Sequence, residues 1–450
     1  MRRTVLLFPG QGAYFPGVLR DRGMDDPVVR EVFTAIDRAA YDADEPPVTP
    51  VLFDRPALAL EDMVEQAPDA LQLALFGICV VVFDDLRRRE VQPWALLGHS
   101  VGEIAAVTCA GAYSVEDGAR IMHLRNRALR EHAAPGRMLA VGADAGTASA
   151  IAHAVNDPRL AVACRNAPRE SVLSGPDESI ERAAAVAAAL GLWHFRLRTP
   201  HAYHCPLLAG AVEPFRRSMA GIRQRPLQHP LQSTGLGRAY QDDDDITGAL
   251  AANLTRPVGL LDAVRDLHAR GAEAFAECGA RDILSRLVAQ TVPGVATVTC
   301  LDQHSGGPSS LEAAARLLAA DDAGRATSPA AVPSQGSPSA DLGRDGLAET
   351  RMSSASHPPG PPSGAPIAPE QAAVYLRAVY AQALEYPEEV VTDDADLEAD
   401  LGVDSVQQTE ILGRAANHFG IPLPERLRMA DFPTISRIAA WFSAQAASRA

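Results

Sequence analysis

Short apolar runs alternate with longer helical patterns up to about residue 320. Val5–Phe8, Trp94–Leu97 and Phe275–Gly279 are brief runs of buried type, which predicts strands covered on both faces. The segments between them carry apolar residues at helical spacing, most clearly over Ala70–Arg89, which ends in three arginines, and Val115–His132. Strands separated by helices predict an α/β domain built on a parallel sheet.

Residues 137–199 follow a different order of elements. The pattern predicts, in sequence, a strand at 138–141, a helix at 145–155, strands at 160–164 and 171–174, a helix at 179–190 and a strand at 193–197. This β-α-β-β-α-β order is the ferredoxin-like pattern. We expect it to form a small subdomain inserted into the α/β domain, which spans residues 1–320.

The composition changes after residue 320. Residues 321–367 are dominated by Pro, Ser, Gly and Ala, which is typical of a flexible linker with an r.m.s. reach of about 35–40 Å. Residues 368–450 show helical spacing at 369–384, 405–419 and 435–446. This spacing predicts a small helical bundle as a second domain.

Charge and cysteine content narrow the class of protein. The 450 residues carry a formal net charge of −15 at pH 7, which argues against nucleic acid or an anionic membrane as a partner. The six cysteines are scattered without a Cys-x-x-Cys pair, so neither a metal site nor a disulfide framework is expected. The first apolar run is too short for a signal peptide, and no stretch is long enough to cross a bilayer, which favours a cytoplasmic location.

The strongest chemical motif is Gly98-His99-Ser100-Val101-Gly102-Glu103, which lies between a predicted strand and a predicted helix. A Gly-x-Ser-x-Gly sequence in that context is typical of a nucleophile elbow, where glycines permit the sharp turn that exposes the serine. Ser100 would then be a nucleophile, and the backbone N–H of Val101 would point at an oxyanion formed beside it. The alternative is a chance match.

Three further features allow either a functional or a structural interpretation. His201 and His204 follow the last strand of the inserted pattern, where a histidine can serve Ser100 as general base or cap the next helix. Gln11 stands between two glycines, in a loop that either places its amide in a site or is a plain turn. Ser405, at the start of a tail helix, is either a phosphorylated serine stabilised by the helix N-terminus or part of an N-cap.

Together these motifs carry two resemblances. Residues 1–320 resemble the malonyl-CoA:acyl-carrier-protein transacylase family, the acyltransferases of fatty-acid and polyketide synthases. The matching stretches, in chain order, are Phe8-Pro9-Gly10-Gln11-Gly12, Gly98–Glu103, Arg125, Asn166-Ala167-Pro168, Val172-Leu173-Ser174-Gly175, His201-Ala202-Tyr203-His204 and Glu277-Cys278-Gly279. The tail resembles an acyl carrier protein, in which Asp404-Ser405-Val406 matches the phosphopantetheine attachment motif and Phe419–Pro424 matches the stretch after the second helix.

The first resemblance implies a fold and a set of catalytic roles. The fold has an α/β-hydrolase-like large subdomain with a parallel sheet, a ferredoxin-like small subdomain and, after the linker, an all-α bundle. Ser100 would be the nucleophile and His204 its general base, with the backbone carbonyl of Asn253 in place of the acid of a catalytic triad. Gln11 and the N–H of Val101 would form the oxyanion hole.

The same resemblance implies how the acyl group is recognised. Arg125 would bind the free carboxylate of a malonyl group as a bidentate pair, although the arginine-rich pattern of its helix alone indicates a solvated face. Tyr203 replaces the usual Phe and adds a hydroxyl near the acyl group. The family pattern also differs at Ala13-Tyr14, at Leu71-Gln72-Leu73 and at Asn126. A substituted malonyl unit is therefore an alternative substrate.

The implied activity is that of an acyl-carrier-protein S-malonyltransferase in polyketide or fatty-acid-like biosynthesis. Malonyl-CoA would be the donor, and a 4'-phosphopantetheine that a phosphopantetheinyl transferase attaches to Ser405 would be the cofactor. Expected partners are carrier domains, in cis or in trans, and polyketide synthase components. Two alternatives stay open. One is an editing hydrolase of the same fold, which Arg125 disfavours because a carboxylate clamp suits neutral acyl chains poorly. The other is a docking module without enzymatic activity.

Overall fold

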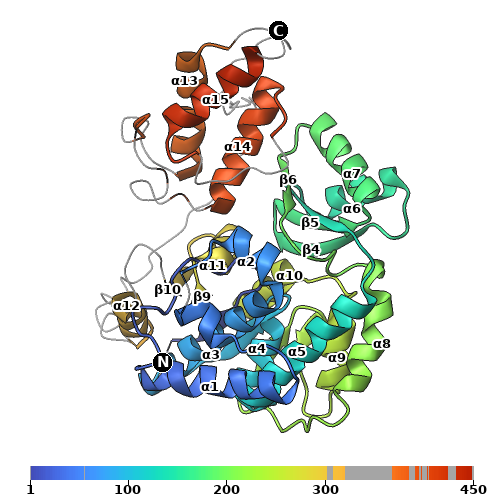
Figure 1. Cartoon of the computed structure of the whole chain (residues 1–450), viewed down its shortest axis with the longest axis vertical. Coiled ribbons are helices and arrows are strands. Elements are labelled where there is room, and N and C mark those ends of the chain that lie inside the picture. The colour runs from blue at the N-terminus through green and yellow to red at the C-terminus, as the bar shows by residue number, and fades with distance from the viewer. Residues whose placement is uncertain are drawn as a thin grey trace, which may run out of the picture. The chain divides into compact units, whose positions relative to one another are not determined.

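The structure, a computed structural model, describes residues 2–54, 56–301, 308–319, 367–384, 391–394, 397, 403, 405–423 and 432–447. The chain divides into two units, Met1–Ala320 and Asp321–Ala450 (Figure 1). The predicted linker lies outside the described residues except for its last residue, Ile367.

A six-stranded sheet with the order β10-β9-β1-β2-β7-β8 forms the centre of the first unit. Its strands are β1 (Thr4–Phe8), β2 (Ala95–Gly98), β7 (Leu231–Ser233), β8 (Arg238–Ala239), β9 (Ala274–Ala280) and β10 (Ala296–Leu301). β8 pairs with β7 in the antiparallel sense, and the other neighbours pair in parallel. The mostly parallel sheet confirms the predicted α/β class.

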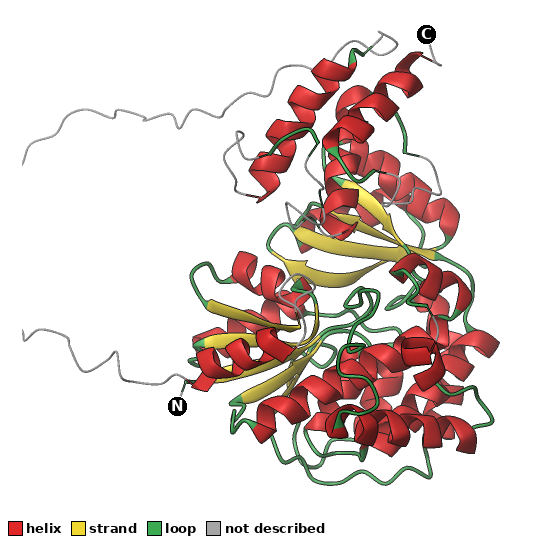
Figure 2. Cartoon of the chain, turned by 60° about the vertical axis from the view of Figure 1, so that its left-hand side comes forward, coloured by secondary structure: helices red, strands yellow, loops and turns green. Residues whose placement is uncertain are grey.

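Successive residues of β1 are buried in two different cores, one on each face of the sheet. Leu6 and Phe8 belong to the core that includes residues of α1 (Pro27–Asp42), α3 (Pro68–Arg88), α4 (Gly102–Cys109) and α5 (Val115–His132). Val5 and Leu7 pack with residues of α10 (Leu260–Ala269) and α11 (Ile283–Thr291). Figure 2 shows helices on both sides of this sheet. Burial on both faces explains why β1 is a continuous apolar run.

The inserted segment forms a separate four-stranded antiparallel sheet with the order β4-β5-β3-β6. Its elements are β3 (Arg137–Val141), α6 (Ala145–Val155), β4 (Ala161–Ala167), β5 (Glu170–Gly175), α7 (Asp177–Ala189) and β6 (His194–Leu197). Figure 1 shows α6 and α7 beside this smaller sheet. The predicted ferredoxin-like order is confirmed.

The sequence pattern did not predict every element of the first unit. β7 has three residues, too few to show a period, and β10 is an edge strand whose first four residues are only half-buried. The π-helical turn Pro50–Asp54 was also not predicted. The remaining elements are α2 (Leu60–Gln66), the 3-10 turn Pro206–Leu208, α8 (Ala209–Ser218), α9 (Ile246–Asn253) and α12 (Pro308–Ala319).

The described part of the second unit contains the three predicted helices. These are α13 (Pro369–Leu384), α14 (Ser405–Phe419) and α15 (Ile435–Ala447). They enclose one apolar core, in which Leu376, Ile411 and Phe442 are at most 1% exposed. A helical bundle at this end of the chain is therefore confirmed.

We expect Gly102→Ala to lower the free energy of unfolding by about 1–3 kcal/mol or more, because α4 begins against the backbone of β1. A Cβ at residue 102 would lie 2.1 Å from the carbonyl O of Phe8 and 2.6 Å from that of Pro9. Urea denaturation measures the loss. Gly146→Ala in α6 is the control, because its Cβ would meet Asp144 Oδ1 at 3.4 Å and its stability should stay the same or rise. Equal midpoints for the two variants would contradict the prediction.

Candidate active site

Ser100 lies in the turn between β2 and α4, and this turn has a strained backbone. Its φ is 55°, in the left-handed region that residues other than glycine seldom adopt. The turn is also closely packed, since a Cβ on Gly98 would lie 2.4 Å from the Cα of Glu103. Strain of this kind persists where the surroundings fix the backbone, and it is common at functional sites. The turn presents Ser100 next to Val101, the N-cap residue of α4.

The side chain of Ser100 contacts a histidine that is distant in sequence. Ser100 Oγ lies 2.7 Å from Nε2 of His204, and Nδ1 of that ring lies 2.7 Å from the backbone O of Asn253 and 3.2 Å from that of Arg256. A carbonyl oxygen can only accept, so Nδ1 carries the proton and donates it. Nε2 is then free to accept the proton of Ser100. The fold thus brings together Ser100, His204 and the carbonyl of Asn253.

The environment of His204 favours its neutral form. The residue is 2% exposed, and its backbone N–H donates to the carbonyl of Leu254 at 2.9 Å. The pKa of the imidazole is lowered to about 3, mainly by burial and also by His99 and Arg125, while the bonds to the carbonyls of Asn253 and Arg256 act in the opposite direction. A neutral imidazole at ordinary pH can act as a base.

Gln11 lies in the loop after β1, and both ends of its amide have partners. Its Nε2 donates to the backbone O of Arg198 at 3.1 Å, and its Oε1 accepts from Nε2 of Gln72 at 3.3 Å. Gln72, which is 3% exposed on α3, thus restrains the oxygen end of the Gln11 amide. Sequence analysis assigned no role to Gln72, and a glutamine at the start of the long apolar run of α3 was the available signal.

Arg125 is a buried cation on α5. Its side chain is 5% exposed, and its Nη1 has no hydrogen-bond partner among the described residues. The guanidinium lies 5.0 Å from the ring centroid of Tyr203, the residue beside His204. Burial lowers the pKa of Arg125, and burial together with the charge of Arg125 lowers the pKa of His201 to about 4. The charge of Arg125 therefore acts on both histidines, and its guanidinium lies against the ring of Tyr203 between them in the sequence.

The other arginines predicted to lie on the solvated face of α5 have acidic partners. Their side chains are 37–42% exposed, and they pair with Asp42, Glu45 and Asp69 on neighbouring segments. These residues are Arg120, Arg127 and Arg130. Arg125 differs from them because it points into the protein.

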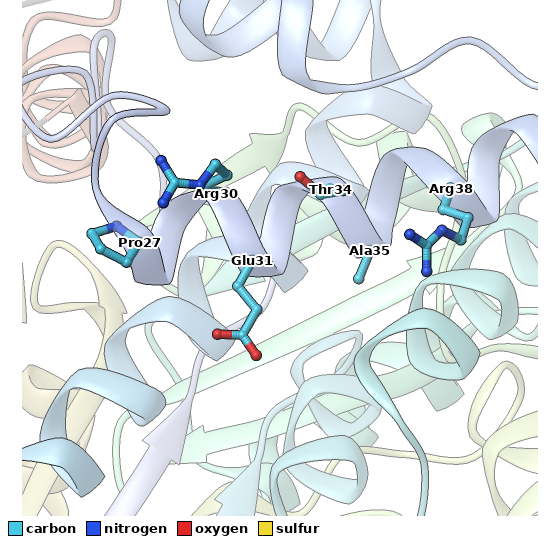
Figure 3. A pocket seen from close by; sticks show the side chains of 6 residues that line it. All are labelled: Pro27, Arg30, Glu31, Thr34, Ala35 and Arg38. Atoms are coloured by element: carbon cyan, nitrogen blue, oxygen red, sulfur yellow. The ribbon is translucent and has the colours of Figure 1, made fainter.

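A hollow on the outer face of α1 lies apart from the predicted site residues (Figure 3). Its lining residues are Pro27, Arg30, Glu31, Thr34, Ala35 and Arg38. Two of its charges are already paired, Glu31 with Arg88 and Arg38 with Glu116. All six lining residues belong to one helix, and we assign no ligand to this hollow.

Ser405 is the first residue of the 15-residue helix α14, and its predecessor Asp404 lies outside the described residues. The free backbone N–H groups of a helix N-terminus stabilise a phosphate, so this position fits a phosphopantetheine attachment.

Within the described ranges, no group of His, Cys, Asp or Glu side chains is arranged to hold a metal ion. The helices described are also too short or too polar to cross a membrane.

Two family models match the chain. Residues 5–311 match the acyl transferase domain, and residues 374–442 match the phosphopantetheine attachment site. Among curated relatives, the spectinabilin polyketide synthase system protein NorA' of Streptomyces orinoci is 32% identical over 317 residues, 68% of this chain and 8% of the relative. Erythronolide synthase EryA2 of Saccharopolyspora erythraea is 33% identical over 311 residues, again 68% of this chain and 9% of the relative. The chain thus spans less than a tenth of these relatives.

Solved structures give the same result. The acyltransferase domain from module 8 of the salinomycin polyketide synthase is 30% identical with a TM-score of 0.62, covering 70% of this chain and 75% of the other. Malonyl-CoA:acyl carrier protein transacylase of Xanthomonas oryzae is 25% identical with a TM-score of 0.64, covering 70% and 98%. Both resemblances inferred from the motifs are confirmed. The chain therefore belongs to the acyl transferase domain family, and it carries a phosphopantetheine attachment domain at its C-terminal end.

Proposed function

We propose that the first unit transfers a malonyl-type acyl group from CoA to a carrier domain through an ester on Ser100. The observation that carries this proposal is the buried guanidinium of Arg125, whose Nη1 lacks a partner among the described residues. A charge removed from water is costly unless it is paired, and a planar guanidinium pairs well with a carboxylate. The free carboxylate of a malonyl group would supply that partner.

In the first half-reaction, Ser100 Oγ attacks the thioester carbonyl while Nε2 of His204 accepts its proton. The carbonyl of Asn253 holds Nδ1–H and thereby fixes the tautomer of the ring. Collapse of the tetrahedral intermediate breaks the C–S bond, and His204 returns the proton to the departing CoA sulfur. The product is an ester on Ser100.

The developing oxyanion needs two donors. The N–H of Val101, at the start of α4, and the Nε2 group of Gln11 are the proposed pair. Gln11 donates to the carbonyl of Arg198 in this structure, at 3.1 Å, so the substrate oxygen would compete for that bond. Gln72 would keep the amide correctly oriented during the exchange.

In the second half-reaction, His204 accepts the proton of the incoming thiol and returns a proton to Ser100 Oγ as the ester breaks. The phosphopantetheine on Ser405, when attached, supplies such a thiol. Carrier domains of other chains are alternative acceptors, and a polyketide assembly line is the proposed setting. This double displacement should give ping-pong kinetics.

Tyr203 bears on which acyl unit is preferred. Its ring faces Arg125, and its hydroxyl replaces a hydrogen of the phenylalanine usual in the family, so a substituted malonyl unit is the second candidate substrate. A hydrolase that removes neutral acyl groups is the less favoured activity, because the unpaired cation of Arg125 would remain buried beside an apolar chain.

We expect Arg125→Ala to reduce malonyl transfer to Ser100 by about 100-fold while acetyl transfer persists or rises, because the lost pair acts only on a carboxylate. Intact-mass analysis after incubation with malonyl-CoA or acetyl-CoA measures both. Arg120→Ala, on the solvated face of the same helix, should leave both rates unchanged. Equal losses for the two donors would refute the clamp. Hydrolysis of acetyl-loaded carriers without a malonyl ester on Ser100 would favour the editing hydrolase.

The pH dependence of Ser100 acylation should lack the usual inflection of histidine near pH 6.5. The pKa of His204 is lowered to about 3, so its imidazole stays neutral and competent as a base well above that pH. The single-turnover rate should therefore be flat between about pH 5.5 and 8. An inflection between pH 6 and 7 that His201→Gln leaves in place would show that His204 titrates normally.

We expect Ser405→Ala to abolish phosphopantetheine attachment and acyl retention on the second unit, since the ester on Ser100 then has no phosphopantetheine thiol in the same chain. Peptide mass spectrometry after treatment with a phosphopantetheinyl transferase measures both. A mixture of Ser100→Ala chains and Ser405→Ala chains permits only transfer between chains. It therefore distinguishes loading of Ser405 within one chain from loading by another chain. Loading at the same rate in the mixture and in the wild type, at every protein concentration, would rule out transfer within one chain.

A further inference from the structure

A buried carboxylate lies behind the residue that holds the histidine. Glu103 is 2% exposed and belongs to the first turn of α4, where its N–H donates to the carbonyl of Ser100 at 3.1 Å. Its Oε2 accepts a hydrogen bond from Nδ2 of Asn253 at 2.7 Å. The backbone O of the same Asn253 accepts from His204 Nδ1 at 2.7 Å.

Two hydroxyl groups complete the environment of this carboxylate. Oε1 of Glu103 accepts from Oγ of Ser233 at 2.5 Å and from the hydroxyl of Tyr240 at 2.7 Å. Ser233 ends β7, Tyr240 follows β8, and Asn253 ends α9, so one side chain joins α4 to three other elements. All three partners donate, which is the arrangement an ionised carboxylate requires.

The three hydrogen bonds oppose the effect of burial on Glu103. Burial raises the pKa of its carboxyl above the usual value, and the bonds from Ser233, Tyr240 and Asn253 reduce that rise without cancelling it. The same carboxylate, together with burial, raises the pKa of Tyr240. A buried negative charge that accepts several hydrogen bonds restrains the groups that donate to it.

The contacts place Glu103 between both members of the Ser–His pair. On one side its backbone N–H donates to the carbonyl of Ser100, and on the other its side chain holds the side chain of Asn253, whose carbonyl orients His204. A displacement of about 1 Å in such a pair can cost about 100-fold in rate. Ser100 and Asn253 come from segments that are distant in the chain. The hydrogen bond between Glu103 and the Asn253 side chain therefore helps to set the distance between Ser100 and His204.

We propose that Glu103 is a positioning residue that sets the geometry of Ser100 and His204 through Asn253. The carboxylate missing from the Ser–His pair is then present one hydrogen bond further away. This inference rests on the proposed nucleophilic role of Ser100, but not on which acyl group is transferred.

The test uses the full chain and a fluorophosphonate reagent, so that it needs no acyl-CoA. Ser100 Oγ forms a bond to phosphorus, fluoride leaves and His204 accepts the proton, and intact mass reports the adduct. Ser100→Ala should abolish labelling. Failure of malonyl transfer would overturn the proposed substrate but leave this measurement informative.

We expect Glu103→Gln to lower the first-order labelling constant at saturation by about 10- to 100-fold, with the half-saturating concentration of reagent unchanged. Asn253→Ala keeps the backbone carbonyl and loses the hydrogen bond to Glu103. It should therefore also lower the labelling constant and leave the half-saturating concentration unchanged. Because both act through one link, the double variant should be no slower than the slower single variant.

Asp157→Asn is the matched control. Asp157 also accepts a serine hydroxyl, that of Ser179 at 2.5 Å, but its partners belong to the small subdomain. Its labelling constant should stay within about twofold of the wild type even where its melting temperature falls. If Asn253→Ala folds and labels at the wild-type rate, or if the two single losses add fully in the double variant, the inference is wrong.

Discussion

The close approach of α4 to the strands beneath it is the constraint on which the site depends. Glycine at positions 98 and 102 removes the side chains that would otherwise meet the backbone of Glu103 and of Phe8, at 2.4 and 2.1 Å. The helix can therefore begin directly above the sheet, and Ser100, between these glycines, has a φ of 55°. The Ser100 hydroxyl, the N–H of Val101 and the buried side chain of Glu103 all belong to this closely packed turn.

Buried polar groups around this turn give the site its chemistry. Arg125 and Glu103 are charged side chains at most 5% exposed, and they differ in how they are satisfied. Glu103 accepts hydrogen bonds from three protein donors, and these bonds join α4 to other segments. The Nη1 of Arg125 has no partner among the described residues, which is why we propose that its charge pairs with a carboxylate of the substrate. Burial of a charged group is costly in both cases, but only Glu103 has its partners within the described part of the chain.

Much of the fold could be predicted because its signals are local. β1, α5, α14 and the order of the inserted subdomain follow from apolar spacing within short windows, and the observed elements agree with them. β7 and β10 were not predicted, because a strand of three residues and a half-buried edge strand show no clear period. Gln72 and Glu103 received no role, because a polar residue in a helix acquires meaning only from the residues it meets.

The sequence by itself determined the class of chemistry. The elbow motif, the His-Ala-Tyr-His stretch and the attachment motif around Ser405 lie at fixed positions in the chain and pointed to the family. The tertiary structure decided which atoms meet: Nε2 of His204 with Ser100, Nδ1 with the carbonyl of Asn253, and Glu103 with the side chain of that asparagine. Hydrogen bonds between residues far apart in the chain form only when the sheet and both subdomains have folded, and no local pattern encodes them.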